Sequence, residues 1–237
     1  AISGETLDYG PCAFLDAYAP DRKFSSIDEG GRYAFEAQPD IALWNLSRLA
    51  DSLVPLVHED EERAVHLLEE RLDTFPRRFH EAYADTMRRK LGLLEHRDDD
   101  LALARDLLAR MAVQQVDFTL LFRRLADGLE GDDAPAASLF AQPDAFREWA
   151  ARWKQRVAAE SRPPAEHAAL VRRTNPAFIP RNHRVEEMIT AAKNGDMSPF
   201  ERLRRVLARP YDEHPEDEEL AHPPGEEQWH YRTFCGT

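Results

Sequence analysis

Apolar residues recur three or four positions apart over most of the chain between residues 39 and 207. The longest such run comprises Leu68, Leu72, Phe75, Phe79, Tyr83, Met87, Leu91 and Leu94, and another comprises Phe146, Trp149, Trp153 and Val157. This spacing places side chains on one face of an α-helix, whereas a half-buried strand requires alternation, which no segment shows convincingly. The sequence therefore predicts a mainly α fold.

Three regions differ in composition. Residues 1–38 are rich in Gly, Pro and aromatic residues without periodicity, which predicts a long, partly buried loop of functional importance. Residues 39–210 are helical, with a first helix that Pro55 is expected to close and a break at Pro76. Residues 211–237 are rich in Pro and acidic residues, so we expect an extended tail in which the charge run at 213–219 is solvated.

The charge and the cysteine content exclude several classes of protein. The 237 residues carry a formal net charge of −13, which argues against nucleic acid as the main partner. No apolar run approaches the roughly 20 residues that span a bilayer, so no membrane association is expected. Only Cys12 and Cys235 are present, which does not suit a disulfide scaffold and favours a reducing, cytoplasmic location.

Two polar clusters are candidates for a site. His214, His222 and His230 lie in the Pro-rich tail, where no helical spacing brings them together, and the chain lacks the usual zinc motifs. Arg181 and Arg184 lie at the start of a predicted helix, whose dipole repels cations. These arginines either face a phosphate or carboxylate or form surface ion pairs with the acidic tail.

Asp8 is the remaining candidate, within Asp8-Tyr9-Gly10. An Asp before a Gly often forms only a local turn. Here the tripeptide introduces a long irregular segment and then an all-helical remainder, and protein kinases follow the same order. In kinases the Asp of an Asp-Phe-Gly motif holds Mg²⁺ beside the nucleotide phosphates, because a hard cation requires carboxylate oxygens.

Longer motifs over the whole chain resemble the selenoprotein O family of pseudokinases. The specific ones are the opening block at residues 3–18 and the closing Phe234-Cys235-Gly236-Thr237. Other matches include Gly31-Arg32-Tyr33-Ala34-Phe35, Pro180-Arg181-Asn182-His183 and Arg209-Pro210-Tyr211. The resemblance implies the helical C-terminal lobe of a protein-kinase-like fold, with a helical extension particular to the family. It also implies transfer of AMP from ATP, bound in a flipped orientation, to Ser, Thr or Tyr hydroxyls of protein substrates.

The same resemblance assigns roles to individual residues. Asp8 would bind Mg²⁺ or Mn²⁺, and its partner Asn would lie upstream of Ala1, together with the N-terminal lobe that contacts the nucleotide. We therefore expect this chain, as the C-terminal half of a bacterial cytoplasmic protein, to be inactive alone and to pair with that missing lobe. Cys235 occupies the place of the selenocysteine in eukaryotic members, and a reversible, redox-sensitive disulfide with Cys12 is one hypothesis beside two ordinary thiols.

Two other functions stay open at this point. Ordinary phosphoryl transfer could occur on the same fold, because the missing lobe sets the orientation of ATP. A non-catalytic helical interaction module is the other alternative.

Overall fold

The computed structural model describes residues 13–225, and its regular elements are helices. The described residues contain no β-strand, only an isolated antiparallel bridge between Ala17 and Asp117. The mainly α prediction is therefore confirmed. In chain order the elements are η1 (Phe35–Ala37), α1 (Gln38–Val57), α2 (Glu61–Leu72), α3 (Phe75–Lys90), α4 (Asp100–Gln114), α5 (Phe118–Leu129), α6 (Ala134–Ala137), α7 (Pro143–Ala158), α8 (Pro164–Thr174), α9 (Asn182–Lys193), α10 (Ser198–Leu207) and η2 (Pro215–Ala221).

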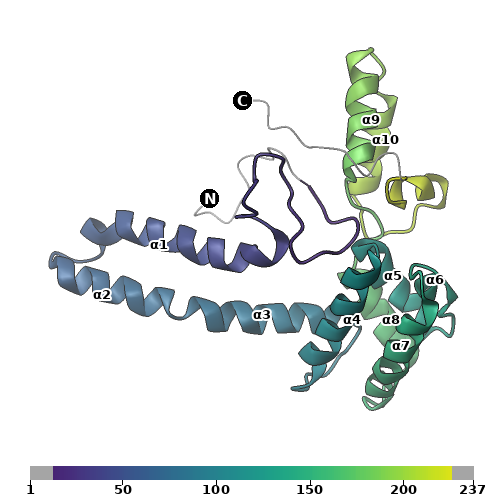
Figure 1. Ribbon diagram of the computed structural model, residues 1–237, viewed down its shortest axis with the longest axis horizontal. Helices are drawn as coiled ribbons and strands as arrows, with labels where there is room; N and C mark the ends of the chain where they lie inside the picture. Colours follow the sequence, from purple (N-terminus) through teal and green to yellow (C-terminus); the bar gives the residue numbers. More distant parts are fainter. Residues whose placement is uncertain (1–12, 226–237) are drawn as a thin grey trace.

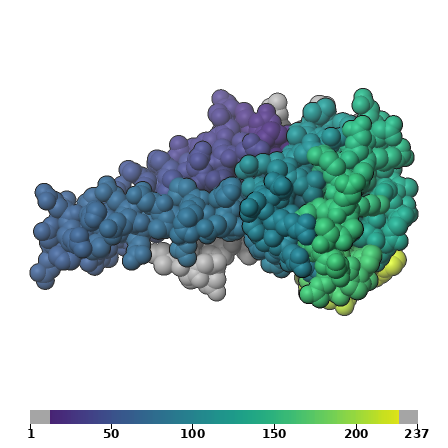
Figure 2. Space-filling model, turned by 90° about the horizontal axis from the view of Figure 1, so that it is seen from below, coloured from purple at the N-terminus to yellow at the C-terminus, as the bar shows by residue number. Residues whose placement is uncertain are grey.

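Helices α1, α2 and α3 form a long arm that projects from the rest of the molecule (Figures 1 and 2). The chain runs out along α1 and returns along α2 and α3, with the predicted break near Pro76 between the two returning helices. The prediction that Pro55 closes the first helix was wrong, because α1 continues to Val57. Pro55 has no N–H to donate to the carbonyl of Asp51, but both residues are exposed, so water can hydrate that carbonyl.

Helices α4, α5 and α7 enclose the main core, which contains the predicted aromatic stripe of α7. Trp149 and Trp153 are fully buried and stack on each other, with ring centroids 5.4 Å apart. Each indole N–H donates to a backbone carbonyl, that of Leu103 for Trp149 and that of Leu91 for Trp153, both at 2.9 Å. Because both indole donors are satisfied, these large side chains can be buried without an unpaired polar group.

Over its described part, residues 212–225, the segment after Tyr211 is not the extended tail that the sequence predicts. It folds as η2 against α9 and α10, where Leu220 joins a second small core with Phe178, Leu203 and Val206 (Figure 1). The charge run is not fully solvated either. The side chain of Asp217 is 1% exposed and accepts hydrogen bonds from the guanidinium groups of two α10 arginines, Arg202 and Arg205. Both arginines lie more than ten residues before Asp217 in the sequence, so local sequence patterns do not reveal this pairing.

Among the described residues, no helix has the length and apolar character needed to cross a membrane.

Candidate functional site

Residues 13–35, which we call the segment after Asp8, are joined to the chain at the start of α5 by backbone hydrogen bonds. The amide of Tyr18 donates to the carbonyl of Val116 at 2.9 Å, and the amide of Phe118 donates to the carbonyl of Asp16 at 2.8 Å. The Tyr18 ring then stacks on Phe118, and its hydroxyl donates to Glu36 at 3.1 Å. Burial raises the pKa of the Tyr18 phenol, so this hydroxyl stays protonated over a wide pH range. The expected loop is therefore irregular but firmly packed over its described part.

Arg181 locks the same segment to the body of the molecule. Its guanidinium binds the carboxylate of Asp117 through two hydrogen bonds, at 2.8 and 3.2 Å, and also binds the carboxylate of Asp16. Its Nε donates to the carbonyl of Ala221 at 2.8 Å. Asp117 in addition caps α5 by accepting from the amide of Leu120 at 2.8 Å. One buried cation thus joins the segment after Asp8, the start of α5 and the end of η2.

The two candidate arginines differ in their environments. The Arg181 side chain is 0% exposed, so of the two alternatives surface pairing with the acidic tail does not apply to this residue. Its anionic partners are the chain's own carboxylates, and burial raises the pKa of one of them, Asp16. Arg184 lies nearer the surface, where it pairs with Glu187 at 2.8 Å and donates to the carbonyl of Glu219, within the predicted acidic tail, at 2.9 Å.

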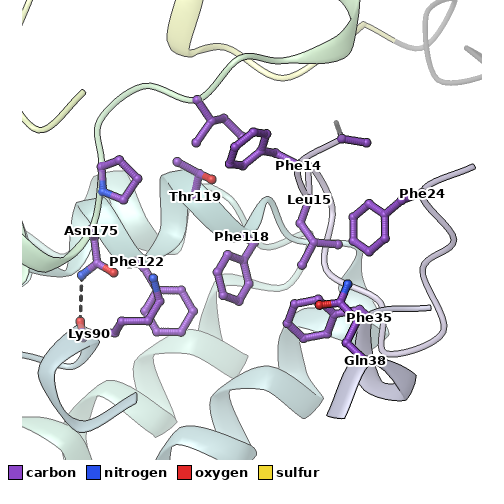
Figure 3. A pocket seen from close by; sticks show the side chains of 13 residues that line it. Phe14, Leu15, Phe24, Phe35, Gln38, Lys90, Phe118, Thr119, Phe122 and Asn175 are labelled. Atoms are coloured by element: carbon purple, nitrogen blue, oxygen red, sulfur yellow. Dashed lines mark hydrogen bonds between the residues drawn. The ribbon is translucent and has the colours of Figure 1, made fainter. Parts of the chain in front are cut away.

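Beside this anchor lies a cavity of about 300 Å³, which we call the Lys90 pocket (Figure 3). Its walls come from the segment after Asp8, from α5 and from the chain that follows α8, and Lys90 at the end of α3 contributes the only ionisable side chain among the lining residues. Most of the lining is apolar, and it includes five phenylalanines: Phe14, Phe24, Phe35, Phe118 and Phe122.

The Lys90 ammonium lies over two of these rings, 5.1 Å from the centroid of Phe118 and 4.8 Å from that of Phe122. Such cation–π contacts stabilise an ammonium group only partly. Within residues 13–225, no carboxylate forms an ion pair with Lys90, and burial lowers the pKa of its ammonium to about 8. The neighbouring Asn175 donates its side-chain N–H to the Lys90 carbonyl at 2.9 Å, while its buried Oδ1 has no hydrogen-bond partner in the described part of the chain.

The other predicted site residues cannot be placed. Asp8, Cys12 and Cys235 lie outside the described residues. Of the described residues, His214, Glu216 and Asp217 have ligand atoms close enough together to hold a metal ion. Since Asp217 already binds two arginines, a cation there would have to displace or face two guanidinium groups, and this donor set does not suit one.

Sequence reasoning missed three residues of this region: Asp16, Asp117 and Lys90. Asp117 carried a detectable signal, since an Asp directly before an apolar helical run is a common N-cap. Asp16 and Lys90 carried none, because their roles depend on residues far away in the sequence.

Comparison with known proteins identifies the family. The family model described as protein adenylyltransferase SelO matches residues 1–208. Curated relatives named protein nucleotidyltransferase YdiU include one from a Bradyrhizobium species, 54% identical over 239 residues. Others come from Methylorubrum extorquens, 53% identical over 246 residues, and Alkalilimnicola ehrlichii, 50% identical over 240 residues. Each alignment covers 100% of this chain and 49–50% of the relative, so the chain spans about half the length of the curated relatives it matches. The chain therefore belongs to the SelO family of protein adenylyltransferases.

Proposed function

We propose that this chain is the C-terminal part of a protein adenylyltransferase that transfers AMP from ATP to Ser, Thr or Tyr hydroxyls of other proteins. The observation that carries the proposal is the match to the SelO family over residues 1–208, which includes the Asp-Tyr-Gly motif. In the reaction, the hydroxyl oxygen bonds to the α-phosphorus of ATP, the bond to the β-phosphate oxygen breaks, and pyrophosphate and the hydroxyl proton leave. The helical body would then be the C-terminal lobe of a kinase-like fold.

Asp8 is proposed as a ligand of Mg²⁺ or Mn²⁺. A bound divalent cation would offset the negative charge of the nucleotide phosphates during transfer. The anchor formed by Asp16, Arg181 and Asp117 supports this role, because it fixes the backbone only eight residues after Asp8. The remaining ligands would have to come from outside this chain, so the chain alone is expected to be inactive.

The proposed partner of the arm is the N-terminal lobe, which accounts for the other half of the relatives' length. Exposed apolar side chains on the arm are consistent with a covering partner; they include Trp44, which is 48% exposed, and Leu56, which is 80% exposed. A groove of about 470 Å³ between α1 and the returning helices is lined by Leu46, Leu53, Leu72, Phe75 and Phe79, among others. An apolar surface of this kind is uncommon on a protein face that remains in water.

The test uses the full-length protein with ATP labelled at either the α- or the γ-phosphate. We expect label from the α-phosphate to appear on protein and Asp8→Ala to abolish it, while the exposed Asp21→Ala leaves it unchanged. Circular dichroism should show the same helix content in all three proteins. Label from the γ-phosphate only would support the phosphotransferase alternative, and no label from either would support a non-catalytic interaction module.

A reversible disulfide between Cys12 and Cys235 also stays a proposal. It is tested by peptide mass mapping before and after reduction, and the absence of a linked peptide under oxidising conditions would refute it.

A further inference from the structure

The Lys90 pocket contains a cation for which the described chain provides no anion. Transferring an ammonium group from water to an apolar cavity is costly unless a counter-charge accompanies it. Elsewhere in the described structure, buried cations are paired: Arg181 binds two carboxylates, and Arg156 binds Asp100 and Glu160. For the Lys90 ammonium, the described residues provide the faces of Phe118 and Phe122 but no carboxylate.

Asn175 provides a second unpaired group on the same wall. It is 1% exposed, and its Oδ1 is buried without a partner among the described residues. In Figure 3 the Asn175 side chain, bonded to the Lys90 carbonyl, lies beside the Phe122 ring and the Lys90 side chain. The partly buried Lys90 ammonium gives this cavity a polar anchor for an anion. The Asn175 Oδ1 is an acceptor, so it requires an N–H or O–H donor, such as a water molecule that a bound ligand also holds, and it does not itself attract a carboxylate.

The rest of the cavity fits an apolar body. Rings of Phe14, Phe24 and Phe35 face it from the segment after Asp8, opposite Phe118 and Phe122 of α5 (Figure 3). A volume of about 300 Å³ is at the small end of the range for ligand pockets and suits one aromatic ring with a short chain. A phosphate dianion would bring more negative charge than one ammonium can neutralise, whereas a carboxylate matches it one to one.

We propose that the Lys90 pocket binds a monocarboxylate with an aromatic body, with the carboxylate on the Lys90 ammonium and the ring among the phenylalanines. Binding would provide the missing counter-charge and remove apolar surface from water at the same time. This inference does not depend on nucleotidyl transfer, since no residue of the pocket is assigned to that reaction.

The probes are 3-phenylpropionate and its neutral analogue 3-phenylpropionamide, titrated into the 237-residue chain near pH 7 and followed by heteronuclear NMR and calorimetry. We expect 3-phenylpropionate to bind with an affinity in about the millimolar range, as its size allows, and about tenfold more tightly than the amide. Shift changes should centre on the backbone amides of Phe118 and Thr119 and on the side-chain amide of Asn175.

Two variants assign the effect to the charge. Lys90→Met keeps the apolar stem and should bind acid and amide equally, whereas Lys193→Met, which alters an exposed lysine, should behave like the original chain. Equal affinity of the original chain for acid and amide would overturn the proposal. So would shift changes away from the pocket, unchanged acid binding by Lys90→Met, or no saturable binding of either probe.

Discussion

Lys90 should make the stability of this chain depend on pH in a direction unusual for a lysine. Burial in the apolar pocket lowers the pKa of its ammonium from 10.5 to about 8. Below pH 8 Lys90 is charged in both the folded and the unfolded chain, and its burial lowers the free energy of unfolding. The difference between the two pKa values corresponds to a loss of about 3 kcal/mol. Between pH 8 and 10.5 the unfolded chain binds more protons than the folded chain, so the Lys90 contribution to stability rises with pH.

The perturbation is Lys90→Met, which removes the charge and keeps a flexible apolar side chain in the pocket. We expect this variant to be more stable than the original chain by about 2–3 kcal/mol near pH 7, after a small loss for the change in shape. The advantage should shrink towards zero as the pH approaches 10.5.

The assay is urea unfolding of both proteins at several pH values, compared as a difference. In the unfolded chain the phenols of Tyr18 and Tyr83 lose their protons near pH 10. In the folded chain burial raises the pKa of both phenols. Their unfolded forms lose protons first, which lowers stability above about pH 10, but this effect is common to both proteins and cancels in the difference. The exposed control Lys193→Met should change stability by less than about 0.5 kcal/mol throughout. A Lys90→Met protein that is less stable near pH 7, or a difference that does not vary with pH, would refute the reasoning.

Three further substitutions test contacts in other parts of the structure. Arg181→Ala leaves two carboxylates without their buried cation and should lower the free energy of unfolding by about 3–5 kcal/mol, whereas Arg184→Ala, nearer the surface, should cost less than about 1 kcal/mol; equal losses would contradict the anchor. Asp217→Ala should detach η2, so that proteases cleave residues 211–225 faster while helix content is kept, and unchanged protection would count against the docked segment. Leu46→Asp on the arm should weaken association with a separately produced N-terminal portion by at least about tenfold, and unchanged association would show that this face is not covered.

Local sequence signals predicted most helices, but they did not predict where α1 ends or that the acidic segment after Tyr211 folds against α9 and α10. The break near Pro76 follows from the proline itself, and the buried face of α7 follows from apolar spacing. Both signals come from residues within a few turns of each other. Pro55 misled the prediction, since proline in an exposed last turn does not have to end a helix. The acidic segment after Tyr211 misled it too, because two α10 arginines compensate the charge of Asp217.

In the candidate site too, local sequence motifs were informative, whereas contacts between distant residues could not be predicted. The opening and closing motifs indicated the family from sequence, and the family match bears this out. The roles of Asp8, Cys12 and Cys235 stay predictions, since these residues lie outside the described structure. Arg181 was noticed only as a basic residue at a helix start, and neither the pairing of Asp16 with it nor the isolation of Lys90 left a pattern in the sequence.

By itself, the sequence determined the helical class, most helix positions and the family, because apolar spacing and contiguous motifs are local properties of the chain. The tertiary structure decided which charges are paired and which are not. Asp16 and Arg181 are 165 positions apart, and only folding brings their side chains together. Lys90 is one of many basic residues in the sequence, but folding places its ammonium over two aromatic rings, without an ion pair to any described carboxylate. The free energy of a charge depends on its surroundings, and those surroundings are assembled from distant segments.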